Sequence, residues 1–180
     1  MAADDETVSA EDEQAEWDRV RSWSRAGGKG LQPASEGPAS ELERELRAAG
    51  IPVQNLWDLA SLQIIYPAAI PILLEHLERP YPDSVKEGII RILGRRESGE
   101  EVHQALLRAL RRDHAILSVD SAFALGNAIA ETAPKGTIDS LLDVASNRDY
   151  GAAREMPVQK LARIGMIEPR GPSRASLRMV

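Results

Sequence analysis

The sequence predicts an all-α protein: a short α-solenoid of about three helix pairs that follows an N-terminal helical cap. The 180 residues suit one domain, and 43 % of them are apolar although only 4 % are aromatic. A core built mainly from Leu, Ile, Val and Ala suits packed helices better than a β-sandwich. Similar leucine-containing segments also recur at spacings of 33 and 35 residues, which indicates a helical repeat.

The composition also excludes several kinds of site and of targeting segment. Without cysteine, the chain forms no disulfide, no thiolate metal site and no thiol nucleophile. Residues 1–18 contain eight acidic side chains, no basic one and no apolar run, so they do not resemble a secretory signal. No stretch approaches the roughly 18 apolar residues of a membrane span. We therefore expect a cytoplasmic protein without membrane contact, and the many Ala and Arg residues favour a bacterial source.

The net charge of −6 is unevenly distributed along the chain. Residues 1–39 carry −5, residues 66–165 carry −1 and residues 168–180 carry +2. A nucleic-acid-binding domain typically presents a broad basic face. Because the predicted repeats are almost neutral, their charge argues against nucleic acid as the main ligand.

The two ends of the chain differ from its middle. Residues 1–39 combine acidic runs with glycine and proline, and we expect them to be largely disordered. Within them, Trp17, Val20 and Trp23 recur every three residues and would share one side of a short helix. This segment either docks on the remainder of its own chain or serves as a linear motif for a partner. Residues 168–180 are expected to form a flexible tail.

Residues 40–63 are predicted to form the N-terminal helical cap. Ser40 and Glu43 fit a capping box at the start of a first helix, and Gly50 with Pro52 ends it. Asn55 would cap a second, short helix. The apolar positions of these two helices are Leu42, Leu46, Ala49, Leu56, Trp57, Leu59 and Leu62.

Residues 64–167 contain three predicted helix pairs. Pro67 suits the start of a helix, and Ser84 with Glu87 and Ser98 with Glu101 fit two more capping boxes. The predicted pairs are 67–79 with 84–94, a helix from Ser98 through Leu110 with 115–130, and 137–146 with 151–164, where Gly165 ends the last helix.

Each pair follows one pattern. The first helices contain Leu73-Leu74, Leu106-Leu107 and Leu141-Leu142. The second helices contain the matching segments VKEGIIRILG (85–94), LSVDSAFALG (117–126) and AREMPVQKLA (153–162). Isolated helix pairs cannot bury their apolar faces, whereas stacked pairs share one continuous core. The Gly or Ala at the end of each segment is expected to permit a tight turn.

This pattern resembles HEAT repeats, especially the short bacterial HEAT-like units that also occur in phycobilin lyases. The resemblance covers about residues 64–167 and implies a right-handed α-α superhelix whose second helices line a concave binding surface. The third unit departs from the pattern at Pro157 and Lys160. We expect the proline to delay or kink the last helix, and the lysine to give it the polar face of a terminal cap.

On the second helices, helical spacing predicts which positions point away from the core. These candidate partner-binding residues are Lys86, Glu87 and Arg91, then Val119, Asp120 and Phe123, then Arg154, Glu155 and Gln159. Phe123 is the only phenylalanine and is either a core residue or a contact for a partner.

The sequence contains no recognisable catalytic, cofactor or metal motif. His76, His103 and His114 lack the spacing of a metal site, and we expect His76 and His114 to be solvated residues at helix ends. Gly27-Gly28-Lys29-Gly30 lacks the spacing and the hydroxyl of a phosphate-binding loop. We therefore expect neither an enzyme nor a bound cofactor.

Six arginines close two consecutive helices: Arg91, Arg95, Arg96, Arg108, Arg111 and Arg112. They either form a positive patch for a phosphate or an acidic partner, or stabilise helix C-termini through the helix dipole. The acidic N-terminal segment would be one possible ligand of such a patch.

The main functional hypothesis is a non-catalytic protein-binding adaptor or scaffold that uses the concave face. An immunity-type protein that neutralises a toxin is one specific form of it. One alternative is nucleic-acid binding, by resemblance to HEAT-like DNA-repair glycosylases, which use a basic concavity. The other is an accessory role resembling that of bilin lyases.

Overall fold

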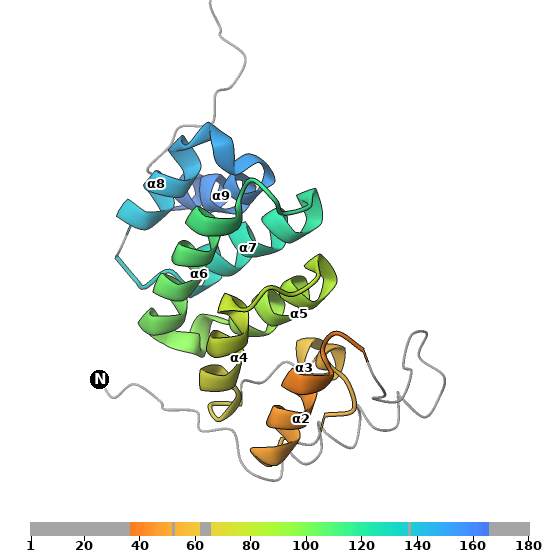
Figure 1. Cartoon of the computed structure of the whole chain (residues 1–180). Coiled ribbons are helices and arrows are strands. Elements are labelled where there is room, and N and C mark those ends of the chain that lie inside the picture. The colour runs from red at the N-terminus through yellow and green to blue at the C-terminus, as the bar shows by residue number, and fades with distance from the viewer. Residues whose placement is uncertain (1–36, 52, 62–65, 137, 166–180) are drawn as a thin grey trace, which may run out of the picture.

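The computed structural model describes residues 37–51, 53–61, 66–136 and 138–165. Every regular element in these ranges is helical: eight α-helices, two short 3-10 helices and no strand. The predictions for the acidic segment, for Leu62 and Thr137, and for the tail 168–180 lie outside the described residues. The helices, labelled in Figure 1, are α2 (Ser40–Ala48), α3 (Leu56–Ser61), α4 (Ala69–Glu78), α5 (Asp83–Leu93), η1 (Arg96–Ser98), α6 (Gly99–Asp113), α7 (Val119–Thr132), α8 (Asp139–Ser146), η2 (Arg148–Arg154) and α9 (Glu155–Arg163).

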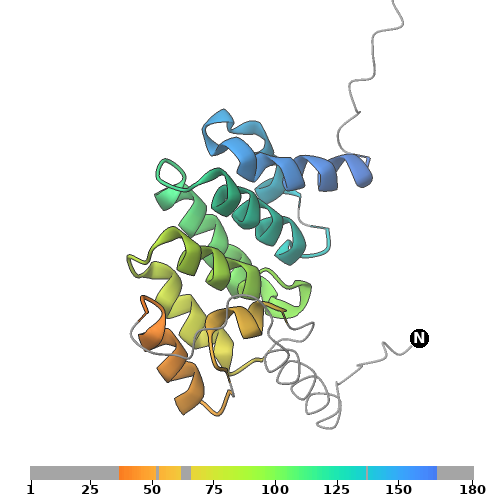
Figure 2. The same ribbon diagram turned by 90° about the vertical axis from the view of Figure 1, so that its right-hand side faces the viewer.

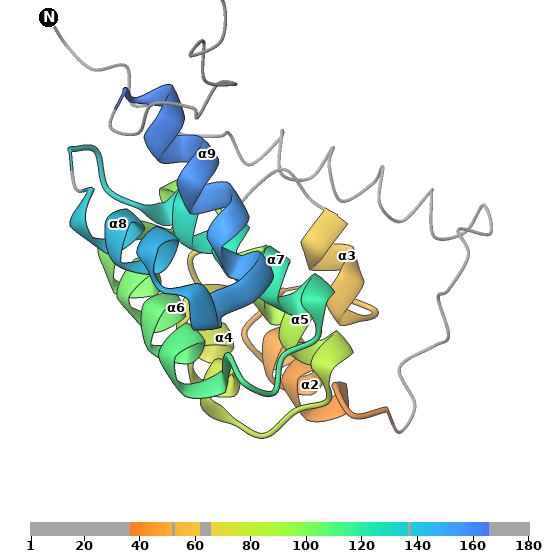
Figure 3. The ribbon, with the colours of Figure 1, turned by 90° about the horizontal axis from the view of Figure 1, so that it is seen from above.

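The helices lie in two layers. Helices α2, α4, α6 and α8 form the first-helix layer, and α3, α5, α7 and α9 form the second-helix layer (Figure 3). Within the second layer, α5 contacts α3 and α7, and α7 contacts α9; within the first, α4 contacts α2 and α6. Consecutive pairs therefore stack along the molecule from its N-terminal to its C-terminal part (Figure 2).

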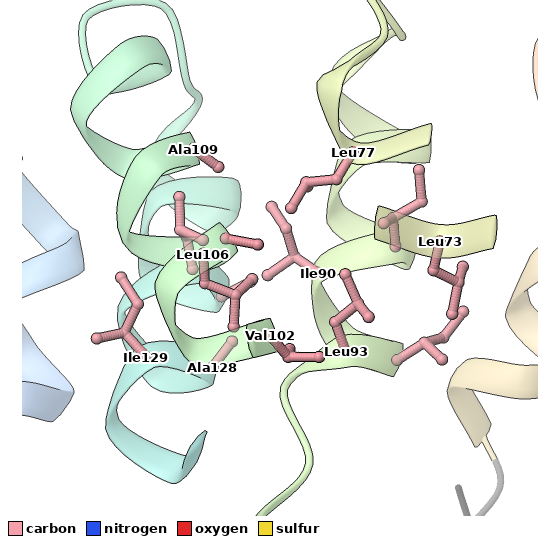
Figure 4. Close-up of a cluster of buried hydrophobic side chains, with 14 of the residues drawn as sticks. Leu73, Leu77, Ile90, Leu93, Val102, Leu106, Ala109, Ala128 and Ile129 are labelled. Carbon is pink, nitrogen blue, oxygen red and sulfur yellow. The ribbon is translucent and has the colours of Figure 1, made fainter. Parts of the chain in front are cut away.

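The core lies between the two layers. Leu73, Leu106 and Leu141, the first leucines of the three predicted pairs, are all fully buried, whereas Leu142 is partly exposed. Side chains from four successive helices meet in this core (Figure 4), among them Leu77 of α4 and Ile129 of α7. Of the predicted leucine pairs, only Leu106-Leu107 is buried at both positions; Leu74 is half-buried. The leucine periodicity therefore correctly predicted the first leucine of each pair as buried, and was wrong for Leu142.

The glycine that closes the repeat segment was predicted to end the second helix, which is wrong for Gly126, whereas Gly94 does follow the end of α5. Gly126 lies inside α7 with helical backbone, and a Cβ added there would lie 2.0 Å from the carbonyl oxygen of Ala153. A Cβ at Gly94, which follows α5, would lie 2.6 Å from the Cβ of Ala128 in α7. Neither glycine makes a tight left-handed turn. Gly126 lets α7 approach the 3-10 helix η2, and Gly94 lets the end of α5 approach α7. These contacts join different helix pairs, so the sequence of a single repeat does not reveal them.

The three predicted capping boxes are also absent. Ser40 is the first residue of α2, and Ser84 lies within α5, so neither occupies the cap position. Ser98 does precede α6, but its backbone is helical and its side chain makes no cap hydrogen bond. By contrast, the predicted Asn55 cap is confirmed, because its side-chain oxygen accepts from the Trp57 amide at 2.9 Å.

Glu43 stabilises a helix other than its own. Its buried carboxylate accepts from the Leu56 amide at 3.0 Å, and so caps the first turn of α3. The helix α2 ends as predicted at Gly50, whose positive φ of 84° accompanies hydrogen bonds from Gly50 to Arg47 and from Ile51 to Leu46. This is the pattern of a Schellman motif.

The last helix begins late, as expected from its proline. α9 begins only at Glu155, after a 3-10 segment, so Pro157 lies in the first turn, where the missing amide breaks no helical hydrogen bond. Lys160 of this helix donates to the carbonyl oxygen of Ala130, one of the last carbonyls of α7. Burial lowers the pKa of Lys160.

Candidate functional site

A pocket of about 210 Å³ opens on the second-helix layer, between α5 and α7 and next to the end of α3. We call it the second-helix pocket. Its floor is made of small residues, of which Ala124 and Ala128 are buried, because close packing of α5 on α7 requires small side chains there. Larger side chains surround the floor. The lining residues are Ala60, Arg91, Gly94, Arg95, Phe123, Ala124, Asn127 and Ala128.

Two of the predicted contact residues meet in this pocket. Phe123 of α7 is 37 % exposed, and Arg91 of α5 has a side chain that is 47 % exposed. Arg91 also pairs with Glu87, one turn earlier on α5, at 2.7 Å. An exposed aromatic ring beside a guanidinium is the residue combination that dominates many protein interfaces. Phe123 is therefore a surface residue, so the core alternative for it is wrong.

Arg95 connects this pocket to α3, on which Trp57 is exposed. The guanidinium of Arg95 donates to the Ala60 carbonyl oxygen at 3.3 Å and so joins α5 to the C-terminal end of α3. Trp57 is 43 % exposed, and its indole ring lies 3.9 Å from the position of a Cβ at Gly88 of α5. Trp57 was expected among the apolar positions of the cap, and it is instead exposed. Gly88 lets α3 approach α5 closely, because a Cβ there would lie 2.6 Å from the Leu56 side chain.

Lys86 is not a surface contact, and its prediction as a partner-binding residue is wrong. It is only 9 % exposed, and its ammonium donates to the Leu77 carbonyl oxygen of α4 at 2.8 Å. The same ammonium lies 3.4 Å from the Asp113 carboxylate. A short turn between α4 and α5 brings the start of one helix against the end of the other. The lysine therefore caps α4 instead of facing solvent.

Arg154 has the same role in the third pair. Its guanidinium Nε donates to the Ala145 carbonyl oxygen of α8 at 2.9 Å. Arg154 and Lys86 occupy the same position of the aligned second-helix segments, and each binds the second-last residue of the preceding helix. This basic position therefore stabilises the C-terminus of the preceding helix, where a positive charge is favoured by the helix dipole.

The remaining predicted contacts are exposed but do not line the pocket. Val119 and Asp120 lie in the first turn of α7, and Glu155 and Gln159 lie on α9. The structure thus places Arg91 and Phe123 in one pocket, and Glu87 is joined to Arg91 by an ion pair. Asp120, Glu155 and Gln159 are exposed elsewhere on the second-helix layer.

A second pocket, of about 310 Å³, lies where the turn between α4 and α5 meets the turn between α6 and α7. Its charged side chains already bind one another. Arg112 holds Asp113 through two hydrogen bonds of 2.7 and 2.8 Å and also pairs with Glu78. The hydrogen bonds from Arg112, with a further contribution from Lys86, lower the pKa of Asp113. This pocket is therefore a structural ion-pair network.

The histidines serve the fold. His76 is fully buried, with ring nitrogens 2.7 Å from the Tyr81 hydroxyl and 3.0 Å from the Glu45 carboxylate, so the expectation that it is solvated is wrong. His103 is also fully buried. His114 is half-buried at the end of α6 and packs edge-on against Tyr150. Among the described residues, no group of three His, Asp or Glu side chains is placed to hold a metal ion.

The arginine cluster does not form one open patch. Arg91 pairs with Glu87, Arg96 with Glu131 at 3.7 Å, and Arg111 with Asp143 at 3.1 Å. Arg112 is held by Asp113 and Glu78, as above. Stacking of the pairs thus brings three of these arginines, Arg96, Arg111 and Arg112, to carboxylates of neighbouring helices and not to one another.

These features define the class: an all-helical protein with a small aromatic and basic pocket on one helical layer. No helix in the described part of the chain has the length and apolarity needed to cross a membrane. Comparisons of the sequence with family models and with curated proteins, and of the fold with solved structures, found no match.

Proposed function

We propose that this chain is a non-catalytic protein-binding adaptor, built as a short HEAT-like α-solenoid that binds its partner on the second-helix layer. The observation that carries the proposal is the second-helix pocket. There Phe123 and Arg91 are exposed beside small residues, and Ala60 of α3 completes the lining. Aromatic and arginine side chains around a pocket are typical of the residues that anchor protein interfaces.

The pocket's size supports a protein ligand. Sites for small molecules and cofactors typically measure roughly 300–1,000 Å³. A pocket of about 210 Å³ suits a single anchoring side chain from a larger partner. The charges of the six-arginine cluster point the same way, because four of its members, Arg91, Arg96, Arg111 and Arg112, pair with carboxylates and do not offer the open basic face that nucleic acid requires.

A site-specific photo-cross-link in the source cells tests the proposal. A photo-reactive residue at position 123 should yield a cross-linked protein, whereas one at exposed position 104, on the first-helix layer, should not. Binding of the cross-linked protein to the purified chain should then weaken by about tenfold or more in Phe123→Ala, as expected for an interface anchor. Equal cross-linking from both positions, or an unchanged affinity, would reject the second-helix layer as the binding site.

A further inference from the structure

The second-helix pocket has the chemistry of a tryptophan site. Its volume of about 210 Å³ is smaller than roughly 300 Å³, the lower end of small-molecule sites, and fits one large side chain. The exposed ring of Phe123 offers an edge or face to another aromatic ring, and the guanidinium of Arg91 can lie over an indole. Since Arg91 already holds Glu87, aromatic contact and not net charge must supply most of the binding.

The chain itself carries a segment that matches this pocket. In residues 11–25, Trp17, Val20 and Trp23 recur at a spacing of three, so that a helical turn would place both indoles on one side. The flanking acidic residues Glu13, Glu16 and Asp18 suit a surface that contains Arg91 and Arg95. The protein has three tryptophans, and the third, Trp57, is exposed on α3, the helix that contributes Ala60 to the pocket.

The connection to the described chain is long enough. Residues 26–36 lie between this segment and Gly37, the first described residue, and are rich in glycine, alanine and proline. Eleven residues span up to about 36 Å when extended. The first turn of α2 is fixed to α3 by the Glu43–Leu56 hydrogen bond, and Ala60, one turn further along α3, lines the pocket. A tether of this length gives an effective concentration on the order of millimolar, so even a weak contact is occupied.

We propose that residues 11–25 dock in the second-helix pocket of their own chain, with a tryptophan as the anchor. The docked segment covers Phe123 and Arg91, and a partner of the same surface must displace it. Only this competition rests on the proposed function; the docking itself does not.

Amide hydrogen exchange of the full-length chain tests the docking. Residues 11–25 should exchange more slowly than an unstructured segment, and this protection should fall by about tenfold or more in Phe123→Ser and in the double variant Trp17→Ser/Trp23→Ser. Arg108→Glu, at an exposed position of α6 on the first-helix layer, is the matched control and should leave the protection unchanged. Unchanged exchange of α4 to α7 in Phe123→Ser shows that the variant is folded.

Three results would overturn the proposal. The segment could exchange at the unstructured rate in the unmodified chain, or it could stay protected when Phe123 is replaced. Protection that depends on protein concentration would instead assign the segment to the pocket of a second copy. The proposed function is tested by a different experiment. It fails if a photo-reactive residue at position 123 gives no cross-link to another protein in a variant that lacks both N-terminal tryptophans.

Discussion

Lys86 is nine-tenths buried, although lysine is among the residues that folded proteins most often expose. The burial is tolerated because the ammonium has a carbonyl partner, Leu77, and a carboxylate partner, Asp113. Arg154 repeats this arrangement with Ala145. Helical spacing alone assigns both basic side chains to the surface. Each is instead buried or half-buried, because it donates a hydrogen bond to a carbonyl oxygen at the end of the preceding helix.

Lys86→Met should consequently destabilise the fold. The substitution keeps the length of the side chain but leaves the Leu77 carbonyl and the Asp113 carboxylate with fewer partners, a loss of about 1–3 kcal/mol. Arg91→Met, whose side chain is half-exposed on the same helix, should change stability by only about 0.5 kcal/mol or less. Urea unfolding followed by circular dichroism measures both. Equal stabilities of the two variants would contradict the capping role of Lys86.

His103 should make the stability depend on pH. Its Nδ1 lies 3.1 Å from the Thr132 hydroxyl, which donates to the Ala128 carbonyl, so the histidine Nδ1–H must donate to Thr132. Its Nε2 is then free to accept from the Ser140 hydroxyl at 2.9 Å. These bonds suit the neutral ring, and burial lowers the pKa of His103.

Proton linkage gives the direction in which the free energy of unfolding changes with pH. Below a pH of about 6.5 the unfolded chain binds a proton at His103 that the folded chain does not, so the free energy of unfolding falls as the pH drops. Above that pH the contribution is constant. His103→Gln should reduce this slope between about pH 6.5 and 5, whereas His114→Gln, at a half-buried site, should retain it. The same slope in His103→Gln as in the unmodified protein would refute the assignment.

At the scale of single helices, close contacts within the second-helix layer depend on glycine. Gly126→Ala would ordinarily stabilise a helix interior by about 0.5–1 kcal/mol. Here the new methyl group would meet the Ala153 backbone, and we expect a loss of about 1–3 kcal/mol instead. Thermal unfolding compared with Gly37→Ala, where nothing lies within 4 Å, measures the effect. A stabilised Gly126→Ala variant would show that α7 does not pack on the 3-10 segment as described.

The helices themselves could be predicted from the sequence, and so could the caps at Asn55 and Gly50, but the three capping boxes were wrong. Apolar periodicity located α2 and α5 within about one residue, because burial of one face repeats at 3.6 residues whatever the neighbours are. The partner of Glu43 depends instead on where α3 lies in space. Helical spacing found Arg91 and Phe123, whereas Ala60 was missed, because its place in the pocket depends on the close approach of α3 to Gly88 of α5.

Across the whole molecule, ion pairs link each first-layer helix to the next. Arg79, which follows α4, pairs with Glu41 of α2 at 3.2 Å. Arg112 of α6 pairs with Glu78 of α4, and Arg111 of α6 pairs with Asp143 of α8. These side chains are partly exposed, so each pair contributes roughly 0–1 kcal/mol. The stacking is therefore held mainly by apolar burial between layers, and the ion pairs favour one register of the helices over others.

If the helix pairs form a solenoid, as we propose, stability should be transmitted only between neighbouring pairs. Leu161→Ala removes a fully buried side chain of α9 and should cost about 2–5 kcal/mol. Amide exchange should then accelerate in α8 and α9 and, to a lesser extent, in α7, whereas α2 to α5 should keep their protection. Leu73→Ala, an equally buried position of α4, should give the reverse distribution. A uniform loss of protection in both variants would mean that one globular core, and not a stack of separable pairs, holds the molecule together.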